Sequence, residues 1–156
     1  MSESNVIQNQ IRLVAFKATK VEFWCNQNPQ AIDLKPKFEI KLSDLLVRDK
    51  PTWFSKVFTI SLTAPTGPIP ETVNFNIEYH TFFECTSPID SVFLGSEFAK
   101  ISAPAIGFPY VRAFISTISV QAGLPPIIIP SINFVQFNKE EEAKLAGQVD
   151  INFSQK

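Results

Sequence analysis

The stretch Ser102–Phe134, SAPAIGFPYVRAFISTISVQAGLPPIIIPSINF, decides the fold. From Phe108 onward its apolar residues recur at helical spacing, and Gly123 supplies a stop signal. Prolines then exclude both a helix and a central strand from residues 124–134, so this segment is expected to run extended over a surface. Because so long an apolar segment needs a cover, we expect it to hold other polypeptides, including copies of the same chain.

Length and composition indicate one domain with its own core. The 156 residues are 45% hydrophobic and 19% charged, and 15 Phe stand beside only 2 Tyr and 2 Trp. The 14 basic and 15 acidic residues form no basic block, which argues against nucleic acid as a partner. The net charge of −1 leaves little self-repulsion, so an oligomer is expected.

Targeting signals are missing from the sequence. Cys25 and Cys85 have no metal spacing and no secretory context, and we expect both to be reduced thiols. The polar N-terminus is not a signal peptide, and prolines break the most apolar run before it reaches the ~18 residues of a membrane span. We therefore predict a cytoplasmic protein that does not insert into a membrane.

Four strands are predicted in the first half of the chain. The pattern over 11–24 indicates a long strand with an irregularity near Ala18, and shorter strands are expected at 38–42, 58–63 and 73–79. Apolar residues alternate with Thr, Ser and Asn in the last two, which is typical of a sheet with one covered face. Residues 44–54 are expected to be a connection, in which Trp53 and Phe54 either cap the sheet edge or form a shelf beside a groove.

Helices are predicted in the second half. Ser87 and Pro88 are typical of an N-cap and a first helical position, and 139–147 is a short charged helix candidate. We expect residues 1–10 to be a flexible lead-in, 11–147 to be the domain, and 148–156 to be a C-terminal tail or an extra edge strand.

Catalytic and metal-binding patterns are absent from the sequence. There is no glycine-rich phosphate loop, no metal-spaced Cys/His set, and no nucleophile with a plausible base. The only histidine, His80, falls on the polar face of a predicted strand, where a surface position is expected. We predict neither an enzyme nor a cofactor or metal site.

The order of four strands and two main helices, with FPYVRAFISTISVQAG leading into LPPIIIPSINF, resembles the SecB family of export chaperones. In that family the second long helix starts with a segment close to FPYAR, and a proline-flanked apolar loop ending in NF follows a glycine. The matching positions in this sequence are Phe108, Pro109, Tyr110, Arg112, Gly123, Pro125, Pro130, Asn133 and Phe134. Weaker similarity in the strands extends the resemblance to about nine-tenths of the chain.

The resemblance implies an α+β protomer with a four-stranded antiparallel sheet, assembled as a dimer-of-dimers tetramer. It also implies an apolar groove that holds unfolded clients without ATP. By this analogy the client-binding side chains are Trp53, Phe54, Phe82, Phe83, Leu124, Ile127, Ile128, Ile129, Ile132 and Phe134. The oligomer interface is expected at Tyr110, Val111, Phe114, Ile115 and Ile118.

The partners implied by the resemblance are extended client polypeptides, either preproteins or an antitoxin, and the translocation motor SecA. Members of the family bind SecA partly through acidic residues on the first strand, where this sequence has Lys20 and Trp24 with Glu22 the only acid nearby. This departure counts against SecA. SecB-like chaperones dedicated to the antitoxin of a toxin–antitoxin pair are the alternative.

The sequence is compatible with two other functions. The apolar loop could serve only to build the oligomer, in which case Ile127, Ile128 and Ile129 would be covered by neighbouring subunits. An aromatic-lined pocket for a small molecule is the third hypothesis.

Overall fold

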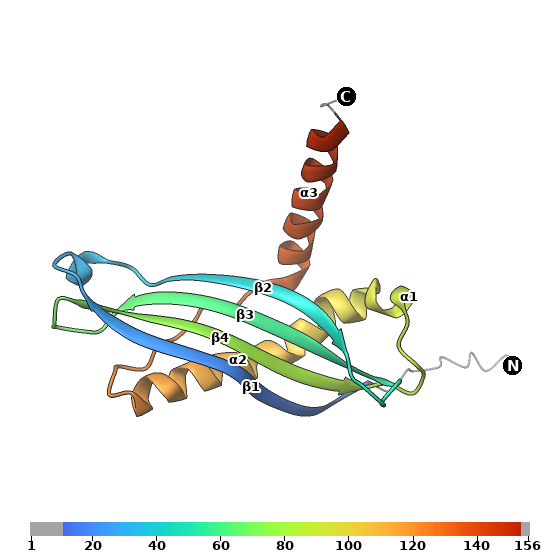
Figure 1. Cartoon of the computed structure of the whole chain (residues 1–156), viewed down its shortest axis with the longest axis horizontal. Coiled ribbons are helices and arrows are strands. Elements are labelled where there is room, and N and C mark those ends of the chain that lie inside the picture. Colours follow the sequence, from blue (N-terminus) through green and yellow to red (C-terminus); the bar gives the residue numbers. More distant parts are fainter. Residues whose placement is uncertain (1–10, 154–156) are drawn as a thin grey trace, which may run out of the picture.

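The computed structural model describes residues 11–153, which form one antiparallel sheet backed by helices (Figure 1). The elements in chain order are β1 (Arg12–Gln27), a 3₁₀ turn (Ala31–Asp33), β2 (Lys37–Leu46), β3 (Trp53–Pro65), β4 (Glu71–Glu84), α1 (Ser91–Leu94), a π-helical turn (Phe98–Ser102), α2 (Ala103–Gln121) and α3 (Phe134–Phe153). The predicted α+β class with a four-stranded antiparallel sheet is confirmed. Residues 1–10 and 154–156 lie outside the described part, so the expectation of a flexible N-terminus concerns residues not described.

The strand order is β1-β4-β3-β2, so β1 and β2 are the two edges of the sheet. Each neighbouring pair is antiparallel, as the alternating patterns predicted. The irregularity expected near Ala18 is confirmed, because the register of β1 against β4 shifts between Ala18 and Lys20. A second shift lies between Leu13 and Ala15.

The helix-facing side of the sheet carries the main core. Phe58 pairs with Tyr79, and Ile60 pairs with Ile77, so that both strands turn apolar side chains toward α2. Val111 of α2 meets them there and is completely buried. A smaller cluster around Phe54 and Phe83 lies beneath α1, at the end of the sheet near the β2–β3 turn.

The connection predicted at 44–54 is shorter than expected. β2 continues to Leu46, the turn occupies residues 47–52 with Asp49 at φ 61°, and β3 begins at Trp53. Leu45 and Leu46 carry the strand further because they pair with Ser55 and Phe54 across the hairpin.

The helix predicted to open at Ser87 begins later and is shorter. Asp90 is the N-cap of α1, because its side chain accepts a hydrogen bond from the Phe93 amide at 2.7 Å. The Ile89 amide donates instead to the Pro51 carbonyl at 2.8 Å, which ties the segment before α1 to the β2–β3 turn. The helix stop at Gly123 is confirmed, since this residue has φ 81° directly after the end of α2.

Helix α3 is longer than the predicted segment 139–147, and the predicted strand in the C-terminal tail is wrong for its described part, because the helix reaches Phe153. Asn133 starts it early by accepting hydrogen bonds from the amides of Val135 and Gln136 at 3.1 and 3.2 Å. In Figure 1, α3 leaves the helical layer behind β2 and projects past that edge of the sheet.

Candidate functional site

The outer edge of β2 is unpaired, and a groove runs beside it. Two adjoining hollows of 680 and 210 Å³ share Leu42 of β2 and Phe137 and Glu141 of α3, and together we call them the β2 groove. The first follows residues 39–42 of β2 and the second follows residues 42–44. An unpaired edge presents free backbone N–H and C=O groups, so this side of the sheet can accept another strand.

The floor of the β2 groove is apolar. Ile40 and Leu42 face the helical layer in register with Ile60 and Phe58, and Phe137 packs against the same core from α3. Because α3 projects past β2, it extends the helical layer beyond that edge of the sheet (Figure 1). An added strand would lie above that helix.

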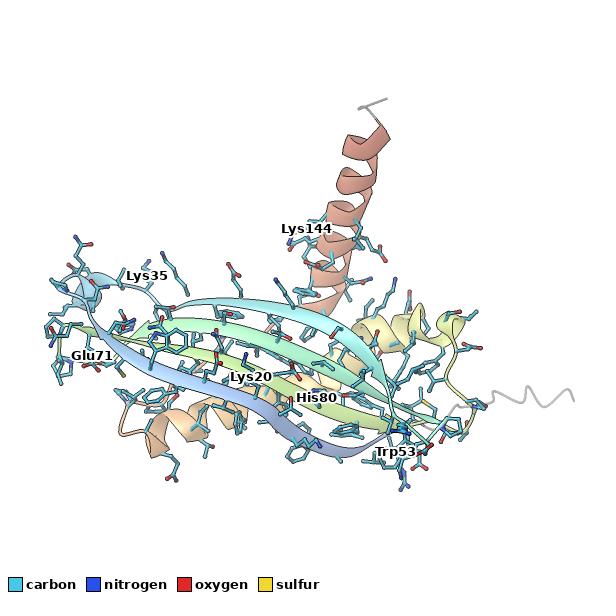
Figure 2. The ribbon with its side chains drawn as sticks, viewed as in Figure 1. Lys20, Lys35, Trp53, Glu71, His80 and Lys144 are labelled. Carbon is cyan, nitrogen blue, oxygen red and sulfur yellow. The ribbon has the colours of Figure 1, made fainter. Side chains whose placement is uncertain are left out.

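Charges of both signs line the walls of the first hollow. Glu39 and Lys41 come from β2, and Glu140, Glu141 and Lys144 come from α3. Figure 2 shows Lys144 on the projecting part of that helix. The walls therefore carry both signs of charge, with one more carboxylate than ammonium group.

A buried ion pair interrupts the apolar floor in the second hollow. Lys56 Nζ lies 2.6 Å from Asp44 Oδ1, and the two residues pair directly across β2 and β3. The Lys56 side chain is only 4% exposed, whereas that of Asp44 is 24% exposed. Lys100 also lines this hollow.

A third hollow, of 320 Å³, lies further along β2 beyond Leu46. It is lined by Leu46, Val47, Asp49, Lys50, Pro51, Trp53 and Ile89. The Lys50 ammonium lies 4.0 Å from the centroid of the Trp53 ring, a cation–π contact that holds the indole at this end of the sheet (Figure 2). The three hollows thus follow β2 along residues 39–47.

The proline-bracketed loop has a fixed end and an exposed tip. Ile129 is buried, and its carbonyl accepts a hydrogen bond from Arg112 Nε at 2.8 Å. Ile128 is 76% exposed, although its neighbours Ile127 and Ile132 pack partly on the core. The loop therefore offers one large apolar side chain while α2 holds its backbone.

Several side chains predicted to contact a client are instead core residues of the protomer. Phe54 and Phe83 are completely buried and stack on each other at 5.3 Å, and Ile129 and Phe134 are almost as inaccessible. The alternation of β3 and β4 points Phe54 and Phe83 toward the helices, whereas Ile129 lies in the loop after α2 and Phe134 at the start of α3. Phe82, by contrast, is half-buried on the open face, and Leu124 is half-buried beside the main core.

The predicted oligomer residues divide in the same way. Val111 and Ile115 are completely buried against the sheet of their own protomer, so they are core and are not offered to another subunit. Phe114 and Ile118 are half-buried at the side of α2. Tyr110 is 40% exposed and packs against Phe16 of β1 with ring centroids 4.6 Å apart.

His80 does not lie on the surface as expected, because it is 7% exposed. On the open face its Nδ1 lies 3.0 Å from Ser55 Oγ and its Nε2 lies 2.9 Å from Glu78 Oε1, which also accepts from Thr19 Oγ1 at 2.8 Å. Both hydrogen bonds lower the pKa of Glu78, and the bond with His80 has the larger effect. Ser55 is completely buried, so its hydroxyl cannot meet a substrate despite the nearby base.

Sequence reasoning missed the residues of the β2 groove. Asp44 continues the alternation of Phe38, Ile40 and Leu42, and Lys56 falls in phase with Phe54 and Phe58. Charged residues in the phase of a covered face are the signal that could have identified the buried pair.

Two kinds of feature are absent from the described residues. No group of three or more His, Cys, Asp or Glu side chains there is placed to hold a metal ion. None of the described helices is long and apolar enough to cross a membrane. Cys25 is an exposed free cysteine and Cys85 is a buried one.

Comparison with a protein-family model identifies the family. Residues 5–144 match SecB, described as preprotein translocase subunit SecB. An uncharacterised protein of Methanocaldococcus jannaschii is 34% identical over 116 residues, which is 72% of either chain. The chain therefore belongs to the SecB family of chaperones, as its resemblance predicted.

One solved structure shares the fold at low sequence identity. A SecB-like chaperone of Mycobacterium tuberculosis, solved in complex with a ChAD peptide from the HigA1 antitoxin, superposes with a TM-score of 0.62 and 13% identity over 78% of this chain and 90% of that one. A Streptococcus agalactiae protein of unknown function gives a TM-score of 0.46 with 9% identity, over 79% of this chain and 98% of that one.

Proposed function

We propose that this SecB family chaperone holds extended client polypeptides along β2 without using ATP. The observation that carries the proposal is the β2 groove, in which an unpaired strand edge borders an apolar floor beside a projecting helix. A client strand would gain backbone hydrogen bonds from the edge and would bury alternate side chains on Ile40, Leu42 and Phe137. Backbone pairing tolerates many sequences, which suits a protein that holds unfolded chains.

The exposed loop tip is a second client contact in this proposal. Burying apolar surface contributes about 25 cal/mol per Å², so one exposed isoleucine adds affinity without making binding irreversible. Among the side chains predicted to contact clients, Trp53 lines the third hollow, and Leu124, Ile127, Ile128 and Ile132 retain some exposure, so these five remain in the proposed site. Phe82 also retains some exposure, but it lies on the open face of β4, apart from the β2 groove. The other four predicted side chains are part of the protomer core and would act by holding the exposed residues in place: Phe54, Phe83, Ile129 and Phe134.

The client class is proposed to be a dedicated one, such as an antitoxin, in preference to preproteins handed to SecA. Lys20 and Glu22 pair at 3.5 Å on the open face of β1, so this region lacks a free acidic cluster for SecA. The M. tuberculosis chaperone with the same fold was solved with an antitoxin peptide. Co-purification of either SecA or one small antitoxin with the tagged chain from its native host distinguishes these partners.

Copies of the chain are proposed to assemble as a tetramer through β1 and α2. The helix-facing side of β1 leaves Phe16, Val21 and Phe23 more than two-fifths exposed, next to Tyr110 of α2. An exposed apolar patch beside an unpaired strand edge favours association. Light scattering on the purified protein measures the mass, and a monomer at micromolar concentration contradicts the assembly.

The function is tested by aggregation of an unfolded client protein. Stoichiometric chaperone should suppress light scattering without ATP, and Ile128→Asp should weaken suppression because the groove and loop would have to desolvate a charge. Val92→Asp on α1 is the matched control, since Val92 is 80% exposed and lies away from the groove. A wild-type protein that fails to suppress aggregation contradicts the proposal.

The alternative function is that of an assembly subunit. The Ile128→Asp variant also distinguishes this function from client binding. If the loop serves only the oligomer, Ile128→Asp changes the oligomer mass and leaves client binding of the remaining species unchanged. If the loop contacts clients, the mass stays the same and capture falls.

A further inference from the structure

We infer that the β2 groove selects an uncharged amide side chain, Asn above all, at the client position opposite Asp44. Apolar side chains fill the alternate positions on both sides of it. The inference rests on the proposed function, because it assumes that a client lies extended along β2.

The register of β2 sets the spacing of this preference. Ile40, Leu42, Asp44 and Leu46 all face the helical layer, in register with Ile60, Phe58, Lys56 and Phe54. Alternate residues of a strand lie about 6.6–6.8 Å apart, so a client strand meets these positions with every second side chain. It therefore encounters two apolar sites, one polar site and one further apolar site beside Trp53.

The buried ion pair has one donor group and one acceptor group to offer. The Lys56 ammonium carries three N–H groups, and Asp44 Oδ1 takes one of them at 2.6 Å. The Asp44 carboxylate has a second oxygen. A primary amide carries both a carbonyl acceptor and an NH₂ donor, so a single Asn can accept from Lys56 and donate to Asp44 without adding charge.

Other side chains suit this position less well. A client carboxylate would face Asp44 and Glu141, and a client ammonium would face Lys56 and Lys100, all of which line the hollow. A leucine would cover the ion pair and remove its access to water without replacing those hydrogen bonds. The two carboxylates and two ammonium groups of the hollow balance each other, so a neutral polar side chain is favoured.

Labelled nine-residue peptides test the inference on the wild-type protein. Each peptide has four alternate positions, of which three carry Leu and the remaining one carries Asn, Leu, Asp or Lys. Every sequence is also made in reverse order, because a client strand can pair with β2 in either the parallel or the antiparallel direction. Fluorescence anisotropy should give the tightest binding for Asn opposite Asp44, with Leu about tenfold weaker, given the cost of leaving a buried polar group unpaired. Asp and Lys should also bind more weakly than Asn, because each faces two groups of its own sign. Moving Asn to the position opposite Leu42 should remove the advantage.

A double variant, Lys56→Met with Asp44→Leu, tests the residues. Replacing a buried ion pair by apolar side chains is often neutral for stability, and thermal unfolding checks that the protein folds. The preference should change from Asn to Leu. The control is Lys20→Met with Glu22→Leu, which removes an ion pair on the opposite face and should keep the preference for Asn.

The outcomes separate this inference from the proposed function. Equal wild-type affinities for the Asn and Leu peptides, or an unchanged preference in the double variant, overturn the amide selection while leaving client binding intact. Absence of binding by all peptides, together with no suppression of aggregation, overturns both.

Discussion

Gly107 of α2 packs so closely on Thr81 of β4 that a Cβ at position 107 would lie 2.8 Å from Thr81 Oγ1 and 2.9 Å from its Cγ2. This close approach sets the distance between the helix and the sheet. The Phe58 ring closes the same site, at 3.2 Å from that Cβ. Glycine is therefore required here for space, since its backbone is ordinary helix.

Gly107→Ala should lower the free energy of unfolding by about 1–2 kcal/mol. Overpacking costs about 1–3 kcal/mol, and the better helix propensity of alanine offsets up to about 1 kcal/mol of it. Urea unfolding measures the change. Gly95→Ala is the control, because its Cβ would meet only carbonyl oxygens at 3.5 Å. Adding Thr81→Ala to Gly107→Ala should recover part of the loss, and a purely additive effect of the two changes contradicts the steric explanation.

Arg112→Met should loosen the loop between α2 and α3. Arg112 donates to the Ile129 carbonyl at 2.8 Å and to Ser131 Oγ at 3.3 Å, so it joins the loop to the helix before it. We expect a loss of about 1 kcal/mol and faster proteolytic cleavage within residues 124–133. Arg48→Met, which changes an exposed arginine in the β2–β3 turn, should leave that cleavage unchanged. Equal cleavage rates in both variants would argue that the arginine does not hold the loop.

Glu84→Gln should make the free energy of unfolding depend less steeply on pH in the acid range. Hydrogen bonds from the Arg12 guanidinium lower the pKa of Glu84 below its ordinary value of 4.5. The charged carboxylate therefore stabilises the fold above the unfolded-state pKa, and this contribution is lost as the pH falls through the folded-state pKa. Urea midpoints between pH 3 and 7 measure the effect. A variant that loses stability on acidification as steeply as the wild type refutes it.

Cys25 should react faster with a thiol reagent than Cys85, because Cys25 is exposed and Cys85 is buried. Partial desolvation of the Cys25 thiol, followed by its hydrogen bond to Glu71 and the charge of that carboxylate, raises the pKa of Cys25. Glu71→Gln removes the charge that disfavours the thiolate, so the reaction of Cys25 near pH 7.5 should accelerate. Measuring it in a Cys85→Ser background isolates one thiol. A rate independent of residue 71 would show that Glu71 does not act on it.

The sequence alone was sufficient to predict the elements with a regular apolar period and the residue at which α2 ends. The alternation of Phe58, Ile60 and Leu62 defined a half-covered strand, and Gly123 marked a helix end that requires a positive φ. The start of α1 was missed because Ile89 bonds to the turn at Pro51, a contact between segments far apart in the chain. Local capping rules carry no information about such contacts.

The candidate site was only partly predictable for the same reason. Aromatic residues in the loop and at strand ends suggested apolar contacts, but Phe54 and Phe83 belong to a core that depends on where α1 packs. Phe137 lies between the apolar loop and the charged segment 139–147. Its role depends on the direction in which α3 leaves the sheet. The unpaired edge of β2 follows from strand order, which the spacing of the strands along the chain does not determine.

The projecting helix also determines what size of object can reach the free edge of β2. At about 1.5 Å per residue, the 20 residues of α3 extend about 30 Å. A folded protein that added its own sheet to β2, with its covering layer on the same side as α3, would have to place that layer where α3 lies. A single extended chain has no second layer. The edge is therefore open to unfolded segments and closed to any domain that covers its sheet on that side.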